Sequence, residues 1–152
     1  CNPKLLAFKQ ANIVSMVELV EIIIEAKNNY GIEGVTYLGG EPTLQQGLSE
    51  LSKRLKQLDI GVFLFTGNLY EELQKKLIDN VDLIVDGQFE KGNLEKKRNL
   101  IGSKNQRLIF VTDRYVNHLN WFLTPCSKNV EINVSEKLII TGDVILNNNH
   151  PI

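Results

Sequence analysis

The stretch VTYLGGEPT, residues 35–43, sets the expectation for the first half of the chain. Its β-branched and aromatic residues predict a buried strand over residues 35–38, and two glycines, a glutamate and a proline come directly after it. Glycines let a ligand approach main-chain N–H and C=O groups because no Cβ stands in the way. The motif is therefore either a plain turn or a place where a ligand meets the backbone.

A helix is predicted before this strand and another after it. Apolar residues at helical spacing follow Ser15, which forms a predicted capping box with Glu18, and Gly31 is well placed to end that helix. A second helix is expected over residues 44–58, with Thr43 beginning its capping box. Alternation of helix and strand in this order favours βα units and a parallel sheet.

The rest of the chain is predicted to continue the alternation of strand and helix, and then to form a polar loop, a further strand and a hairpin. Strands are expected at residues 61–65, 81–86 and 106–112, and a third capped helix begins near Asn68. Polar residues 87–104 predict an exposed loop. The end of the chain predicts a hairpin, with strands VEINV and KLIITG flanking Ser135 and Glu136.

Three of the predicted strands end in small or polar residues. In parallel α/β sheets, ligands bind at the carboxyl ends of the strands, and these three exits would share one edge. We expect Glu41 to accept hydrogen bonds from a ligand ammonium and Pro42 to help begin the next helix. The candidate binding residues are Gly39, Gly40, Glu41, Pro42, Thr66, Gly67 and Asp86.

Length and composition limit the alternatives. A chain of 152 residues fits one domain, and a formal charge of −1 gives no field that would attract nucleic acid or an acidic membrane. No apolar run is long enough to suggest a membrane span. Two cysteines, Cys1 and Cys126, make no disulfide framework, so a cytoplasmic protein is expected. Cys126, His118 and His150 are interpreted as ordinary structural or surface residues.

The order of several motifs resembles one known family. LGGEP after a strand is similar to the Gly-Gly-Glu-Pro motif of radical S-adenosylmethionine enzymes, and CNPK is similar to the segment that begins with the third cysteine of their Cys-x3-Cys-x2-Cys motif. TGN-x2-EEL, VDLIVDGQF, GSKNQR and the closing hairpin resemble segments of the glycyl radical enzyme activating proteins, above all those that serve anaerobic ribonucleotide reductase. The similarity covers nearly the whole chain.

This resemblance implies a cofactor pair. Three cysteines, Cys1 and two upstream at positions −3 and −7 relative to it, would hold a [4Fe–4S] cluster, and S-adenosylmethionine would chelate its open iron. Reductive cleavage would give a 5′-deoxyadenosyl radical that abstracts hydrogen from a glycine of a partner enzyme. The expected partners are a glycyl radical enzyme, first of all anaerobic ribonucleoside-triphosphate reductase, and a reductant such as flavodoxin or ferredoxin.

The resemblance also implies the architecture. We expect a partial, open β/α barrel of the radical S-adenosylmethionine type with a C-terminal antiparallel element, because a full barrel needs about 250 residues. Residues 1–152 would form a single domain that lacks the N-terminal segment with the first two cluster cysteines. Asn68 and Gln88 stand where this family usually has an aromatic residue and a proline.

Several simpler interpretations remain open. Thr66 and Asp86 are residue types that also begin helices and form turns, residues 105–107 could simply start a strand, and the basic run 96–98 fits a solvated loop. Two other functions share these motifs: a small radical enzyme of the deazapurine type, and a cluster-less α/β binding module. The second would require that no cysteines precede Cys1.

Overall fold

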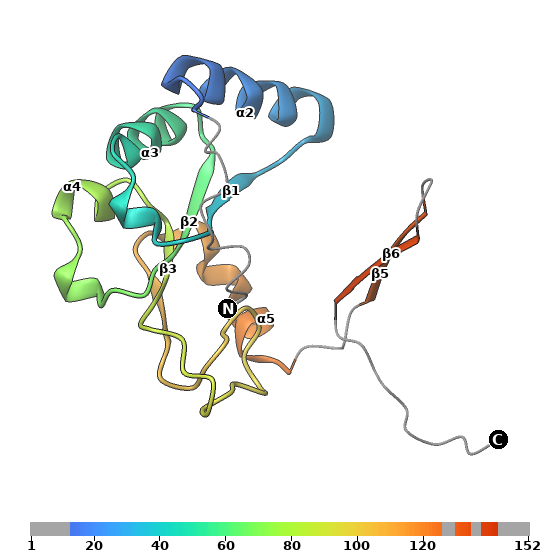
Figure 1. The fold of residues 1–152 in the computed structure, drawn as a ribbon. Helices are drawn as coiled ribbons and strands as arrows, with labels where there is room; N and C mark the ends of the chain where they lie inside the picture. The colour runs from blue at the N-terminus through green and yellow to red at the C-terminus, as the bar shows by residue number, and fades with distance from the viewer. Residues whose placement is uncertain (1–12, 126–129, 135–137, 143–152) are drawn as a thin grey trace.

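The computed structural model describes residues 13–125, 130–134 and 138–142 of the chain (Figure 1). Its first described helix, α2, spans Met16–Tyr30. Ser15 caps it, because the Ser15 hydroxyl accepts a hydrogen bond of 3.1 Å from the Glu18 N–H. Gly31 ends it in the left-handed conformation, with φ at 67°, and donates its N–H to Lys27 O. Both predicted ends of this helix are confirmed.

Four strands form one open sheet in the order β1-β2-β3-β4. The strands β1 (Gly34–Tyr37), β2 (Gly61–Phe65) and β3 (Leu83–Asp86) run parallel, and β4 (Arg107–Phe110) is antiparallel to β3. The predicted parallel α/β arrangement is thereby confirmed for the first three strands. The sheet is not closed, so the partial barrel itself stays a prediction.

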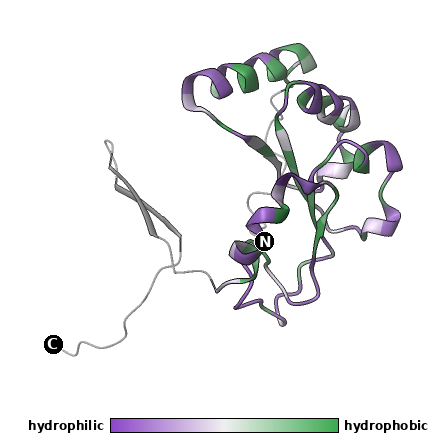
Figure 2. Ribbon diagram, turned by 180° about the vertical axis from the view of Figure 1, so that it is seen from behind, coloured by the Kyte–Doolittle hydropathy of each residue, from purple (hydrophilic) through white to green (hydrophobic). Residues whose placement is uncertain are grey.

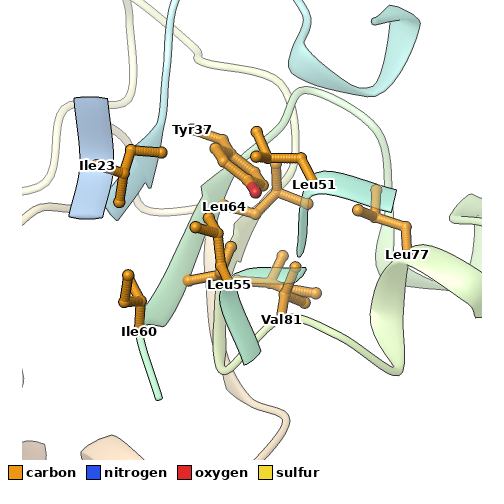
Figure 3. Close-up of a cluster of buried hydrophobic side chains, with 10 residues drawn as sticks. Ile23, Tyr37, Leu51, Leu55, Ile60, Leu64, Leu77 and Val81 are labelled. Carbon is orange, nitrogen blue, oxygen red and sulfur yellow. The ribbon is translucent and has the colours of Figure 1, made fainter. Parts of the chain in front are cut away.

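The hydrophobic core lies between one face of this sheet and the helices α2, α3 (Leu48–Gln57) and α4 (Lys75–Ile78) (Figure 1). Figure 2 shows hydrophobic and hydrophilic residues alternating along α2 and α3, as expected for helices that cover a sheet on one side. Figure 3 shows the side chains that meet there. The core comprises Ile23, Tyr37, Leu51, Leu55, Ile60, Val62, Leu64, Leu77, Val81 and Ile84.

One polar contact within this core fixes β1 to α3. The Tyr37 hydroxyl lies 3.1 Å from the Ser52 hydroxyl, and both side chains are buried. Burial raises the pKa of Tyr37 to about 12, so the phenol stays protonated and keeps a proton for this bond.

Aromatic side chains cover the opposite face of the sheet. Phe63 and Phe65 stack with their ring centroids 4.6 Å apart, as expected of neighbours on one side of a strand. Phe122, from the short helix α5 (Leu119–Leu123), meets the edges of Phe63 and Phe110. The middle of the sheet is therefore covered on both faces, and the carboxyl edge is where ligands bind in parallel α/β sheets.

Two predicted helix starts are wrong. Helix α3 begins at Leu48 after Gly47, and Thr43 lies instead in the short 3-10 helix η1 (Pro42–Leu44), because the carboxylate of Glu41 binds its N–H and hydroxyl. Asn68 likewise caps no helix. The next turn, η2 (Tyr70–Glu72), is closed by Glu72, whose carboxylate accepts the Leu69 N–H at 2.9 Å.

The predicted closing hairpin is confirmed. Strands β5 (Val130–Val134) and β6 (Leu138–Gly142) pair antiparallel and form a second, two-stranded sheet. A further 3-10 helix, η3 (Asp113–His118), precedes α5. None of the helices within the described ranges is long and apolar enough to cross a membrane.

Replacing Leu55 with Ala should lower the free energy of unfolding by about 2–5 kcal/mol, because this side chain is fully buried in the hydrophobic core. Urea unfolding followed by circular dichroism measures the change. The matched control is Leu44→Ala, whose side chain is 78% exposed and should alter stability little. Equal losses in both variants would contradict the placement of the core.

Candidate functional site

The exits of β1 and β2 are joined by the carboxylate of Glu41. Its Oε1 accepts hydrogen bonds from the Thr66 hydroxyl at 2.7 Å, from the Thr43 hydroxyl at 2.6 Å and from the Thr43 N–H at 3.1 Å. Its Oε2 accepts the Gly67 N–H at 2.8 Å. One side chain therefore binds groups from both strand exits.

Asn68 extends this network. Its side-chain amide donates to the Thr43 hydroxyl at 2.9 Å, and its N–H donates to the Thr66 hydroxyl at 3.1 Å. The two threonines thus each bind Glu41 and Asn68. We call Glu41, Thr43, Thr66, Gly67 and Asn68 the exit clamp. Sequence analysis placed Glu41, Thr66 and Gly67 at one site, but it missed the part played by Thr43 and Asn68.

The exit clamp favours the ionised form of Glu41. Partial burial alone would raise the pKa of its carboxyl group, but the hydrogen bonds from Thr43, Gly67 and Thr66 outweigh burial and hold the pKa below its usual value. The carboxylate already accepts four hydrogen bonds within the protein. Contact between Glu41 and a ligand ammonium therefore stays a prediction. In the structure this side chain joins the exits of β1 and β2.

The backbone just before Glu41 is open. A Cβ built on Gly39 or on Gly40 would meet nothing within 4 Å, and Leu38 beside them is 73% exposed. Gly39 has φ at 122°, which L side chains rarely adopt, whereas Gly40 has no such requirement. Neither its backbone conformation nor a neighbouring atom in the described protein requires glycine at position 40. The space in front of its backbone would therefore allow a ligand to approach the main chain.

A cavity of about 690 Å³ adjoins this backbone. Gly40, Glu41 and Pro42 line one side of it, and apolar side chains of α2 and β1 line much of the rest. Pro42 itself is buried. This volume is within the range of small-molecule sites. Among the described strands, β1 lies at one edge of the sheet.

Asp86, at the exit of β3, is bound differently. Its side chain is fully buried, and its Oδ2 accepts the Tyr70 N–H at 2.7 Å. It also forms an ion pair with Arg107 of β4, which reaches on to Glu71 at 2.8 Å. These bonds from Asp86 and Glu71 raise the pKa of Arg107.

The partner of Asp86 could not be found from the sequence. Arg107 lies directly opposite Asp86 only because β4 runs antiparallel to β3 in this register. Since the protein itself satisfies Asp86, ligand binding by this residue stays a prediction. The exits of β2 and β3 are still in contact, because the Gly87 N–H donates to Asn68 O at 3.2 Å.

No group of three His, Cys, Asp or Glu side chains that could hold a metal ion occurs among the described residues. Cys1, the predicted cluster ligand, lies outside them, as do Cys126 and His150. The described strand exits fit the other expected cofactor: open backbone at Gly39 and Gly40 beside a cavity offers polar main-chain groups to an amino acid end.

Replacing Glu41 with Gln should lower the free energy of unfolding by about 1 kcal/mol, because an amide cannot accept at both ends of the exit clamp. The lowered pKa of Glu41 also predicts a pH effect. Its contribution should be complete above pH 4.5, the ordinary value, and should be lost as the pH falls through the folded-state pKa.

Urea unfolding of wild type and variant between neutral pH and about pH 3 tests both points. The matched control is Glu50→Gln, which removes only an exposed ion pair with Arg54 and should cost less than about 0.5 kcal/mol. If the stability difference between wild type and Glu41→Gln stayed constant down to acid pH, the exit clamp would not depend on the charge.

Comparison with known proteins identifies the family. The family described as "4Fe-4S single cluster domain" matches residues 1–109. The anaerobic ribonucleoside-triphosphate reductase-activating protein of enterobacteria phage T4 is 33% identical over 118 residues, which are 72% of this chain and 73% of that protein. No solved structure matches this chain.

A second relative, from Methanocaldococcus jannaschii, carries the name of a putative glycyl-radical enzyme activating enzyme. It is 37% identical over 71 residues, which are 45% of this chain but only 28% of that protein. The family resemblance, the enzyme class and the cofactor pair expected from the sequence are confirmed by these findings. The chain belongs to the 4Fe–4S single-cluster domain family, among the radical S-adenosylmethionine activating enzymes.

Proposed function

We propose that this protein installs a glycyl radical on a partner enzyme by radical S-adenosylmethionine chemistry. The observation that carries the proposal is the open backbone at Gly39 and Gly40, held beside the exit clamp in a chain whose relatives are activating enzymes. The partner we propose is an anaerobic ribonucleoside-triphosphate reductase, since the phage T4 relative bears the name of its activating protein.

Each candidate residue then has a role. Gly39 and Gly40 offer backbone groups to the amino acid end of S-adenosylmethionine, while Glu41, Thr66 and Gly67 hold that backbone in place. Pro42 fixes the bend after Glu41, and Asp86 holds the exit of β3 through Arg107 and Tyr70. Cys1 would be one of the thiolate ligands of the cluster.

The bound cofactors would supply the reaction itself. A [4Fe–4S] cluster bound by Cys1, and S-adenosylmethionine held at Gly39 and Gly40, would supply the one-electron reductive cleavage and the hydrogen abstraction from the partner's glycine. The protein's own task is to orient the sulfonium ligand and to keep water from the radical. The apolar side chains of α2 and β1 that line the cavity beside Gly40 suit the second task.

Replacing Gly40 with Val should abolish binding of S-adenosylmethionine without unfolding the protein. A branched side chain would occupy the space that the ligand needs, whereas the described protein has no atom within 4 Å of the new Cβ. Isothermal titration of the anaerobically reconstituted full-length protein measures the affinity, and circular dichroism monitors the fold. Gly92→Val is the matched control, because that glycine also faces open space in a loop. Wild-type affinity in the Gly40 variant would reject the assignment.

Replacing Cys1 with Ala should remove the cluster. Three thiolates hold a [4Fe–4S] cluster of this type, and the two that remain after the substitution are too few to hold it. Iron analysis and electron paramagnetic resonance after reduction measure the loss, and reductive cleavage of S-adenosylmethionine should disappear with it. Cys126→Ala should retain all three signals. A full cluster complement in the Cys1 variant would mean that Cys1 is only an ordinary thiol.

A further inference from the structure

The loop between β3 and β4, residues 87–106, is long and without helix or strand. Loops of more than about 12–15 residues are usually either functional or disordered. Sequence analysis interpreted most of this segment as a polar, exposed loop. The structure instead gives it an interior of its own, in which hydrogen-bonded polar side chains accompany the buried Ile101.

The side-chain amide of Gln106 closes the base of the loop. Its Nε2 donates to Gly87 O at 2.9 Å, and its Oε1 accepts the N–H groups of Gly102 at 3.0 Å and Ser103 at 3.1 Å. The hydroxyl of Ser103, which is fully buried, accepts the Glu90 N–H at 3.0 Å. These hydrogen bonds satisfy backbone groups of the loop, as strand pairing satisfies those of the sheet.

Arg98 holds the middle of the loop. Its guanidinium donates to Glu95 at 2.6 Å, to Lys104 O at 2.9 Å and to Gln106 O at 2.9 Å. Backbone N–H groups that follow Glu95, together with Arg98, lower the pKa of Glu95 to about 2, so this carboxylate stays ionised. The basic run is thus only partly solvated: Arg98 is internal, while its two lysine neighbours are exposed.

The tip of the loop is fixed to helix α5. Asn99, which is 5% exposed, donates its N–H to Phe122 O at 2.8 Å and its side-chain amide to Trp121 O at 2.6 Å. The next residue, Leu100, has φ at 65°, a strained value for a branched side chain, and yet it is half exposed. Backbone strain is often found at functional sites, and here it occurs at an exposed apolar residue on a tip that hydrogen bonds hold in place. This combination indicates a functional surface.

The loop and α5 carry exposed side chains of two kinds, apolar and basic. Trp121 and Leu123 of α5, adjoining the tip through Asn99, are 53% and 51% exposed. The loop holds five of the chain's 17 Lys and Arg residues but only two of its 18 Asp and Glu residues. Four of these basic residues are exposed and form no ion pair with any described residue: Lys91, Lys96, Lys97 and Lys104.

We propose that the loop tip and α5 form the docking surface for the glycyl radical enzyme, and that the docked segment of this enzyme presents acidic side chains around an apolar pocket. This rests on the proposed function. The loop starts at Gly87, whose N–H binds Asn68 of the exit clamp, so the base of the docking loop adjoins the proposed radical site. Trp121 and Leu100 supply apolar anchors, and the lysines steer an acidic partner into place.

Two variants test the two parts of the surface. Lys96→Glu/Lys97→Glu reverses charge without touching the internal bonds of Arg98, and should slow association at least about tenfold at low ionic strength, with a smaller effect at high ionic strength. Leu100→Asn removes the exposed apolar side chain, and asparagine tolerates φ above zero. It should speed dissociation about tenfold. The control, Lys53→Glu/Lys76→Glu, makes the same charge change on α3 and α4 and should bind as wild type does.

The probe is purified anaerobic ribonucleoside-triphosphate reductase from the same source, with rates measured by biolayer interferometry against the reconstituted full-length protein. Cleavage of S-adenosylmethionine by dithionite without the reductase should be unchanged in every variant, while the glycyl radical yield falls in the two surface variants. Wild-type binding by both surface variants overturns the docking proposal and leaves the function standing.

Three other outcomes are also decisive. A wild-type protein that neither cleaves S-adenosylmethionine nor forms the radical refutes the proposed function itself. A wild-type protein that cleaves it but does not bind the reductase overturns the docking proposal. If the surface variants alter only self-association in sedimentation velocity, the surface is a contact between two copies, and the docking proposal is again overturned.

Discussion

The carboxylate of Glu41 is the contact that sets the geometry of the candidate site. It binds the Thr66 hydroxyl and the Gly67 N–H, which belong to the exit of β2, while its own backbone continues β1. Glycines at positions 39, 40 and 67 would otherwise leave both exits with wide conformational freedom. One ionised side chain therefore decides where the open backbone at Gly39 and Gly40 points.

A second ionic contact fixes the other side of the same edge. Asp86 at the end of β3 is buried, and Arg107 joins it to Glu71 in the turn after β2. The three strand exits are thus held before any ligand arrives. Binding to preset backbone groups costs less free energy of ordering, which would be an advantage for the proposed reaction, since it depends on the placement of one radical.

The parts of the fold that were predicted well are those that local chemistry determines. The caps of α2 at Ser15 and Gly31, and the strands and hairpin, depend on neighbours in sequence. Thr43 and Asn68 also carry the signature of a helix cap, but in the structure they bind each other across two strand exits, and Thr43 also binds Glu41 beside it. Such a competition between local and distant hydrogen bonds has no signal in a single sequence.

In the candidate site, too, the positions of the residues were predictable from local sequence, whereas their distant hydrogen-bond partners were not. Sequence analysis selected Glu41, Thr66 and Gly67 because each follows a strand, and the structure brings them into contact. From the sequence Glu41 was predicted to bind a ligand, because two of the four donors around this carboxylate, from Thr66 and Gly67, meet it only when the strand exits are in place. Asp86 was selected for the same reason, and its pairing with Arg107 depends on the antiparallel register of β4.

A crystal structure of the anaerobically reconstituted full-length protein with S-adenosylmethionine tests the central claim most directly. The account predicts that the amino acid end of the ligand lies within hydrogen-bonding distance of the main chain at Gly39 and Gly40, with Glu41 still bound to Thr66 and Gly67. If Glu41 left Thr66 and Gly67 to bind the ligand, or if the ligand lay away from Gly39 and Gly40, the account would be contradicted.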